Sequence, residues 1–82
     1  MVDVTFTEEF KAIFLNIKDK LLKEKILKQI EKIKNNPEVG KPMRYQRKGT
    51  LELYIKPFRL SYEYMKDKDH VHILDLYHKK KQ

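Results

Sequence analysis

Basic side chains are concentrated in the second half of this 82-residue chain, and they are the groups best suited to chemistry. Residues 40–82 carry eight Lys and three Arg against five acids, whereas residues 1–39 carry eight Lys against seven acids. The two halves therefore contribute +6 and +1 to the formal net charge of +7. Because tyrosines are interleaved with these cations, the composition favours a polyanionic partner, most simply RNA or DNA.

Arg59 is the strongest single candidate for a functional side chain. It lies between Phe58 and Leu60 in a segment that alternates as a strand does, where an unpaired charge would be costly. A guanidinium presents a planar fork of donors that matches the oxygens of a phosphate. Two interpretations are open: Arg59 contacts a phosphate or a transition state, or it forms an ion pair with Glu52 or Asp75 across the sheet.

The candidate general acids and bases are limited to Glu52, Asp75, His78, the tyrosines and the lysines. RNA is a substrate for which such groups suffice, because its own 2′-OH is the nucleophile. The protein then needs only to orient the chain, remove a proton, stabilise the phosphorane charge and protonate the leaving 5′-oxygen. The His78 imidazole could exchange a proton near neutrality, the alternative being an exposed histidine in a tail.

Two short basic segments are candidates for contacts with RNA. The segment Arg44-Tyr45-Gln46-Arg47-Lys48 combines a ring with three cations, which suits backbone contacts and base stacking. The run Lys79-Lys80-Lys81 either binds the RNA backbone or keeps this end of the chain solvated. Tyr54 and Tyr77 are candidates for stacking on bases.

Several kinds of site are excluded by what the sequence lacks. Without cysteine it can form neither a disulfide nor a thiolate metal site, and it contains no Gly-rich phosphate loop and no nucleophile elbow. His70 and His72 flank a predicted turn at i, i+2 but have no acidic or Cys partner at ligand spacing. We therefore expect neither a metal nor a cofactor.

A membrane partner is not expected either. No stretch approaches the roughly 20 apolar residues that cross a bilayer, and residues 1–5 lack the layout of a signal peptide. We expect a cytoplasmic protein. Heavy use of Lys with little Gly favours a thermophilic source.

The elements that must position these side chains begin with a strand and two helices. Residues 2–6 alternate apolar and polar, and a helix is predicted over residues 8–17 with Thr5 or Thr7 as its N-cap. Asp19 is predicted to cap a second helix that ends at Asn35, because Pro37 follows. The apolar stripes at helical spacing are Phe10, Ile13, Phe14 and Ile17, and then Leu22, Ile26, Leu27, Ile30 and Ile33.

Three strands are predicted after a loop over residues 37–49. They cover residues 50–56, 58–65 and 71–77, separated by Pro57 and by a polar turn at residues 66–69. The order is β-α-α-β-β-β within one domain over residues 1–82. We predict an α+β fold in which an antiparallel helical hairpin packs on one face of a small antiparallel sheet.

A period of two along these strands separates a core face from an open face. The core face is predicted to take Leu51, Leu53 and Ile55, then Phe58, Leu60, Tyr62 and Tyr64, and finally Leu74 and Leu76. The pair Ile73-Leu74 breaks the alternation, and a bulge there would change the assignment. The open face is predicted to gather Glu52, Tyr54, Lys56, Arg59, Asp75, Tyr77 and Lys79, with His78 beside them.

A set of short motifs runs through nearly the whole chain. It comprises a first strand ending in Phe6 and followed by Glu9-Phe10, Lys-rich helices, Gly40-Lys41-Pro42, Leu51-Glu52-Leu53-Tyr54-Ile55, Phe58-Arg59-Leu60-Ser61-Tyr62 and Ile73-Leu74-Asp75-Leu76-Tyr77-His78-Lys79. This combination resembles the RelE/ParE superfamily of type II toxin–antitoxin toxins, and most closely the RelE-like mRNA interferases of archaeal or thermophile type. The aromatic-Arg-aliphatic-x-Tyr strand and the basic end after the last strand are its most specific parts.

The resemblance implies a fold like that of the microbial RNases and, for RelE-like members, an endoribonuclease that inhibits translation. Such members cleave mRNA in the ribosomal A site by 2′-OH attack, so the ribosome and mRNA are expected partners. A RelB-like cognate antitoxin that wraps and neutralises the toxin is expected as well. By resemblance, Arg59 falls on the arginine near the scissile phosphate, and Lys79 lies near the basic position after the last strand. Tyr77-His78 looks like the ending of members that use a terminal histidine as general acid.

The site residues predicted from the sequence form two sets. The catalytic set is Arg59, His78, Lys79, Lys56, Tyr54 and Glu52. The RNA-binding set is Arg44, Arg47, Lys48, Tyr77, Lys80 and Lys81.

The chain also departs from the family pattern. Many RelE members carry Lys at the positions aligned with Glu52 and Tyr54, and here only Lys56 is left on that strand face. Glu52 could act as the base instead. ParE-like toxins, which inhibit DNA gyrase without cutting RNA, generally lack the cluster of catalytic basic residues, so gyrase inhibition is the alternative function. A degenerate or purely regulatory binding partner is a third possibility.

Overall fold

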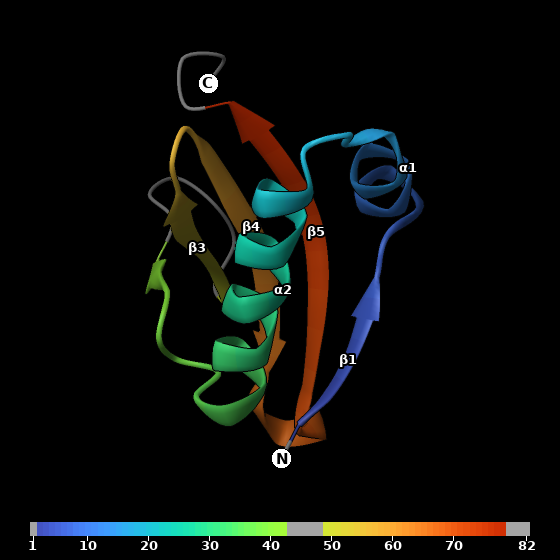
Figure 1. Ribbon diagram of the computed structural model, residues 1–82. Coiled ribbons are helices and arrows are strands. Elements are labelled where there is room, and N and C mark those ends of the chain that lie inside the picture. The colour runs from blue at the N-terminus through green and yellow to red at the C-terminus, as the bar shows by residue number, and fades with distance from the viewer. Residues whose placement is uncertain (1, 43–48, 79–82) are drawn as a thin grey trace.

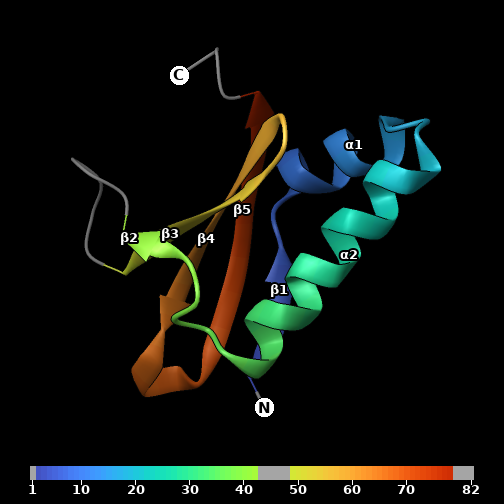
Figure 2. The ribbon, with the colours of Figure 1, turned by 60° about the vertical axis from the view of Figure 1, so that its left-hand side comes forward.

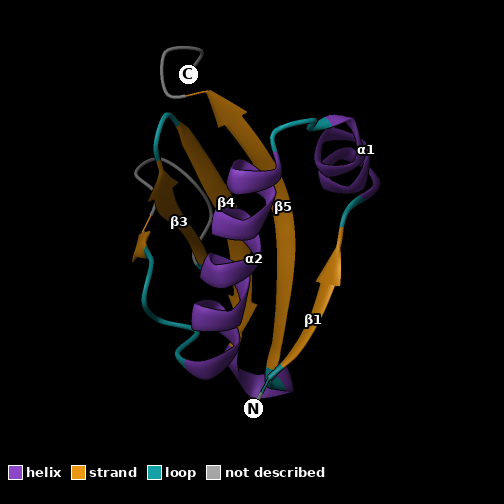
Figure 3. Cartoon of the chain, viewed as in Figure 1, coloured by secondary structure: helices purple, strands orange, loops and turns teal. Residues whose placement is uncertain are grey.

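Two helices lie against one face of a five-stranded sheet in the computed structural model, which describes residues 2–42 and 49–78. Figure 1 shows α2 running lengthwise over the sheet, and Figure 3 separates the helical layer from the strands by colour. The predicted α+β class is confirmed. The elements are β1 (Asp3–Phe6), α1 (Glu8–Asn16), α2 (Lys20–Asn35), β2 (Lys41–Pro42), β3 (Thr50–Ile55), β4 (Phe58–Met65), the 3₁₀ turn η1 (Lys66–Lys68) and β5 (His70–His78).

Both helices begin at a side chain that caps them. Thr7 Oγ1 accepts a hydrogen bond from the N–H of Phe10 at 3.1 Å, so Thr7 and not Thr5 is the N-cap of α1. Asp19 caps α2 as predicted, because its carboxylate accepts from two N–H groups of the first turn. In Figure 1 α1 is seen nearly end-on while α2 runs along the sheet, so the two helices cross steeply instead of lying antiparallel. No helix among the described residues is long and apolar enough to cross a bilayer.

The sheet has the strand order β1-β5-β4-β3-β2. The pairs β5–β4 and β4–β3 are antiparallel, as predicted, and β3–β2 is antiparallel as well, whereas β1 is parallel to β5. The predicted sheet was antiparallel throughout, and β1 departs from it. The two helices carry the chain back across the sheet before β3 begins, so β1 is not joined to a neighbouring strand by a tight turn. The two-residue strand β2 lies in the predicted loop and was missed, because two residues show no period. Figure 2 shows β2 at one edge of the sheet and both helices on one side of it.

The hydrophobic core lies between α2 and the helix-facing side of the sheet. Its members are Ile26, Ile30 and Ile33 from α2, Ile55 from β3, Leu60 and Tyr62 from β4, and Val71, Ile73 and Leu76 from β5, together with Val2 and Phe10. Leu27 was predicted in this stripe but is 54% exposed. It lines an open apolar groove together with Phe10, Phe14 and Leu15 of α1.

A bulge in β5 resets the alternation of that strand. Ser61 pairs with Asp75, but the next residue of β4, Tyr62, pairs with Ile73. Leu74 is therefore the extra residue of the bulge. Ile73 therefore takes the buried position that was predicted for Leu74, while Leu76 stays in the core as predicted.

The bulge also decides which β5 side chains share the open face. Before it, His70 and His72 alternate with the buried Val71. After it, Asp75 and Tyr77 alternate with buried Leu76. Side chains from both halves of β5 thus lie on the face turned away from the core.

Candidate functional site

Four predicted site residues of β3, β4 and β5 meet on the open face of the sheet, namely Glu52, Tyr54, Arg59 and Tyr77. Arg59 pairs with Tyr54 on one side and with Tyr77 on the other, so the three side chains form a row across three strands. Leu60, the neighbour of Arg59 in β4, is fully buried, which places Arg59 on the opposite face. Glu52 lies diagonally from Arg59, two residues along β3 from Tyr54.

The Glu52 carboxylate is held from two strands. Its Oε1 atom lies 3.0 Å from Nη1 of Arg59, and its Oε2 atom accepts a hydrogen bond from the Tyr77 hydroxyl at 3.0 Å. The Arg59 and Glu52 side chains are 27% and 20% exposed, so the pair is largely shielded from water. Of the two possible ion-pair partners, Arg59 therefore takes Glu52, while Asp75 accepts from the backbone N–H of Leu76 at 2.8 Å.

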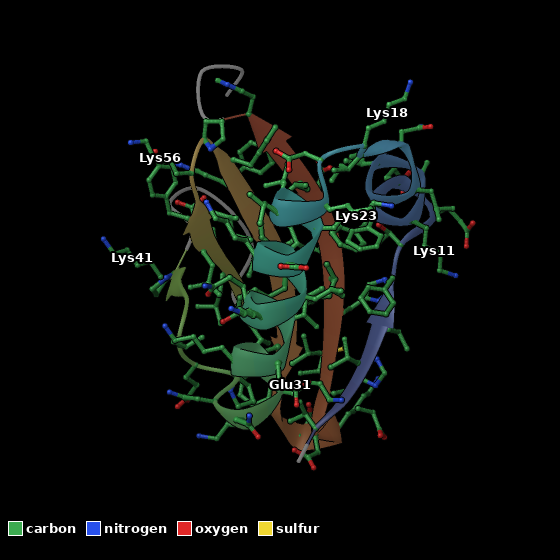
Figure 4. All side chains as sticks on the ribbon, in the orientation of Figure 1. Lys11, Lys18, Lys23, Glu31, Lys41 and Lys56 are labelled. Carbon is green, nitrogen blue, oxygen red and sulfur yellow. The ribbon has the colours of Figure 1, made fainter. Side chains whose placement is uncertain are left out.

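A cleft of about 450 Å³ opens beside this cluster, around the edge of β3. Lys32 and Lys41 line it with Arg59, and Glu52 is the one acidic side chain in its lining. The excess of positive charge suits an anionic ligand. In Figure 4, Lys41 on β2 and Lys56 at the β3–β4 turn extend outward from the same edge of the sheet.

Tyr54 and Lys56 border the row on the side of β3. Tyr54 is 54% exposed, which leaves much of its ring accessible beside Arg59. Lys56 is exposed at a turn closed by the cis Lys56–Pro57 peptide, in agreement with the predicted turn at Pro57. Tyr54 therefore lies on the open face as predicted, whereas Lys56, predicted as the end of that strand, lies in the turn after β3.

His78 lies on the other face of the sheet, which corrects its predicted place beside the open-face set. It is the last residue of β5 and pairs with Phe58, and the two rings meet edge to face with centroids 5.5 Å apart. Alternation puts His78 on the same side as Leu76. The predicted strand ended at residue 77, whereas β5 continues through His78 and so fixes the side of the sheet on which this ring lies.

The other predicted site residues lie outside the described part of the chain. They are Arg44, Arg47, Lys48, Lys79, Lys80 and Lys81. Their roles stay predictions.

Tyr62 holds the connection between α2 and β2 by two hydrogen bonds. Its hydroxyl donates to the carbonyl of Pro37 at 2.8 Å and accepts from the N–H of Gly40 at 2.9 Å. Burial raises the pKa of this hydroxyl above its ordinary value, the Glu38 charge acts in the same direction, and the Gly40 hydrogen bond opposes them. Sequence reasoning placed Tyr62 in the core but missed this function, for which the only local signal was Gly40.

Gly40 has no room for a side chain. A Cβ there would lie 2.7 Å from the Tyr62 hydroxyl oxygen and 2.8 Å from the carbonyl oxygen of Glu52. The close approach brings β2 against β3, and so positions Lys41 at the cleft. Among the described residues, no group of three or more His, Asp or Glu side chains is arranged to hold a metal ion.

The chain matches a family model described as "ParE toxin of type II toxin-antitoxin system, parDE" over residues 2–82. Among curated proteins, none shows significant similarity to it.

Solved structures with the same fold come from bacteria and archaea. The intact *E. coli* RelBE toxin–antitoxin complex includes a chain that is 15% identical, with a TM-score of 0.83, over 95% of this chain and 96% of that one. The archaeal RelE–RelB complex from Pyrococcus horikoshii OT3 gives 13% identity and a TM-score of 0.81, over 99% and 98% of the two chains. The RelBE2 toxin–antitoxin complex from Mycobacterium tuberculosis gives 24% identity and a TM-score of 0.78, over 95% and 98%. The fold is therefore shared with these chains at low sequence identity.

Proposed function

The chain belongs to the ParE toxin family of type II toxin–antitoxin systems, within the RelE/ParE superfamily. From the side chains of its open face, and not from the family match, we propose that it is a ribosome-dependent endoribonuclease that cuts mRNA. The observation that carries the proposal is the cluster of Glu52, Arg59 and Tyr77 on the open face. A carboxylate, a guanidinium and a phenol there can accept a proton, stabilise an anion and donate a proton.

The proposed reaction needs no nucleophile from the protein. Glu52 takes the proton of the 2′-OH while that oxygen attacks the adjacent phosphorus, and Arg59 stabilises the added charge on the phosphorane oxygens. The bond from phosphorus to the 5′-oxygen then breaks, and Tyr77 supplies the proton that the leaving oxygen takes up. The products are a 2′,3′-cyclic phosphate and a 5′-hydroxyl end.

The ion pair is compatible with this role for Arg59. A guanidinium carries five N–H groups, so Arg59 can hold Glu52 through Nη1 and still offer donors to a phosphate. The cleft beside the pair supplies Lys32 and Lys41 for neighbouring phosphates. Tyr54 is proposed to stack on a base next to the scissile bond.

The remaining predicted residues extend the proposed RNA path. Lys56 would contact the RNA backbone from the β3–β4 turn, and the cations outside the described residues would add to the same electrostatic attraction. His78 is the second candidate for the proton donor, reached from the end of β5.

A protein antitoxin is the proposed regulatory partner. The chains of like fold from *E. coli* and Pyrococcus horikoshii were solved as toxin–antitoxin complexes. We propose a RelB-like partner with an acidic surface, because this toxin carries a net charge of +7. Action on translating ribosomes would take place in the cytoplasm.

Gyrase inhibition is the alternative function, and one observation favours it. Arg59 is neutralised by Glu52 at a position where many RelE members carry Lys, so the open face has fewer unpaired cations than a RelE-like site would have. A toxin that binds gyrase has no need of a phosphate-cleaving centre.

Induced expression with two readouts tests the proposal. We expect ribosome-bound mRNA to acquire new ends within codons while purified gyrase keeps its supercoiling activity in the presence of the toxin. Arg59→Ala should lower cleavage by about 10²–10³-fold, the typical effect of losing one electrostatic donor. Lys66→Ala is the matched control, because Lys66 is 80% exposed and its ion pair, at 3.9 Å, is with the exposed acid Glu38.

The opposite pattern would replace the proposal. Intact mRNA together with gyrase inhibition and DNA breaks would establish the alternative function. If Arg59→Ala and Lys66→Ala lost cleavage equally, the cleavage activity would not depend on the open-face cluster.

A further inference from the structure

Two histidines and a threonine form a second polar cluster on the open face, far from Arg59 along β5. The Thr5 Oγ1 atom lies 2.8 Å from Nε2 of His70 and 2.7 Å from Nδ1 of His72. The histidines belong to β5 and the threonine to β1, which pairs with β5 in parallel. Two imidazole nitrogens from one strand therefore converge on a single point.

The early start of β5 creates this convergence. The strand begins at His70 instead of the predicted residue 71, so both histidines lie within it and, two residues apart, on one face. The Thr5 partner lies 65 and 67 positions away in the sequence, and spacing along the chain could not reveal it.

The surroundings favour a cation. In the sheet register Asp3 lies directly beside His70, and Glu63 lies directly beside His72, so a carboxylate adjoins each imidazole on the same face. The Thr5 contacts lie in an exposed part of the surface, which gives an ion access from solvent.

We propose that His70 and His72 form a bidentate site for a divalent transition-metal ion such as Cu²⁺, Ni²⁺ or Zn²⁺. The ion binds Nε2 of His70 and Nδ1 of His72 and lies near the Thr5 hydroxyl, with water in its other positions. The hydroxyl lies 2.8 Å and 2.7 Å from the two nitrogens, at the point on which they converge. An ion about 2.1 Å from each nitrogen takes this point after the Thr5 side chain turns aside.

The hydrogen bonds already present the nitrogens in a suitable state. The Thr5 hydroxyl has one proton, so it donates to one imidazole and accepts from the other. One nitrogen therefore directs its lone pair to the shared point, and the second does so after a change of tautomer. Imidazole suits Cu²⁺, Ni²⁺ and Zn²⁺, and among them Cu²⁺ binds most tightly.

The site is exchangeable and lies apart from the proposed RNA site. Two imidazoles are fewer protein ligands than a structural zinc site uses. Because the ion would bind folded chain in preference to unfolded chain, it would stabilise β5 against β1 and raise the melting temperature with metal concentration. The proposal does not depend on RNA cleavage.

Metal titration of the untagged chain tests it. Cu²⁺ is added while its visible absorption and electron paramagnetic resonance are recorded, and melting is compared with Zn²⁺ and with chelator. We expect one equivalent to bind with nitrogen coupling in the resonance, and His70→Gln or His72→Gln to weaken binding on the order of tenfold or more. His78→Gln is the matched control, since it removes the third histidine, which lies on the other face.

A measurement on the wild-type chain covers the case in which a variant fails to fold. Zn²⁺ should shift the imidazole ¹⁵N resonances of Nε2 in His70 and Nδ1 in His72 and leave those of His78 in place. Binding that survives His70→Gln and His72→Gln, or shifts confined to His78, would overturn the proposal.

Discussion

Glu52 and Arg59 form an ion pair between adjacent strands, with Oε1 of one 3.0 Å from Nη1 of the other and at most 27% of either side chain exposed. The pair lies on the open face, where a charge left alone would be only partly solvated. Neither residue can therefore be replaced without affecting the other, in stability as well as in any chemistry.

The first prediction concerns stability. Glu52→Gln or Arg59→Met alone should lower the free energy of unfolding by about 1–3 kcal/mol, since each leaves a shielded charge without its partner. The double variant should cost less than the sum of the two. Urea unfolding of the four proteins measures the coupling. Additive losses would mean that the pair contributes no net interaction energy.

The second prediction identifies the proton donor of the proposed reaction. The Tyr77 hydroxyl touches Glu52, whereas the His78 ring packs on Phe58 across the sheet. Tyr77→Phe should therefore reduce cleavage by about 10²-fold, typical of a lost acid–base group, and His78→Gln should have the smaller effect. Single-turnover cleavage on programmed ribosomes makes the comparison. The reverse order would assign the donor to His78.

The third prediction concerns alkaline pH. Because the pKa of Tyr62 is raised in the folded chain, the unfolded chain loses this proton first as pH increases. The contribution of this pKa difference to the free energy of unfolding is complete below about pH 10. It is lost as the pH rises through the higher pKa of the folded chain. Urea unfolding at about pH 8 and about pH 11 should show a larger alkaline loss for wild type than for Tyr62→Phe.

The same variant has a cost at neutral pH. Tyr62→Phe removes both hydrogen bonds of the hydroxyl and should lower the free energy of unfolding by about 1–3 kcal/mol. Tyr64→Phe, in the same strand, is the control for deleting a hydroxyl. Equal pH dependence in wild type and Tyr62→Phe would show that another group causes the alkaline loss.

The fourth prediction concerns Gly40. A methyl group there meets the Tyr62 hydroxyl and the Glu52 carbonyl, so Gly40→Ala should destabilise the fold by about 1–3 kcal/mol. Combining it with Tyr62→Phe should cost less than the sum, because the hydroxyl, one of the three atoms within 3.0 Å of the added Cβ, is removed. Thermal melts of the three variants measure this, and a Gly40→Ala protein as stable as wild type would refute the close approach.

Local signals predicted most of the elements. The period of two placed β3 and β4 and put Arg59 on the face opposite Leu60, and Asp19 and Pro37 marked the two ends of α2. These signals lie within a few residues of the structure that they specify, so the sequence alone contains them.

Long-range pairing decided what the sequence left open. It selected Glu52 over Asp75 as the partner of Arg59, made β1 parallel to β5, and brought Thr5 between two histidines. The bulge at Leu74 and the extension of β5 to His78 set the faces of the last strand. Side-chain alternation is a local property, whereas register depends on which strands pack together. The sequence by itself therefore determined most of the strands and the face that carries Arg59, and the tertiary structure decided which side chains meet there.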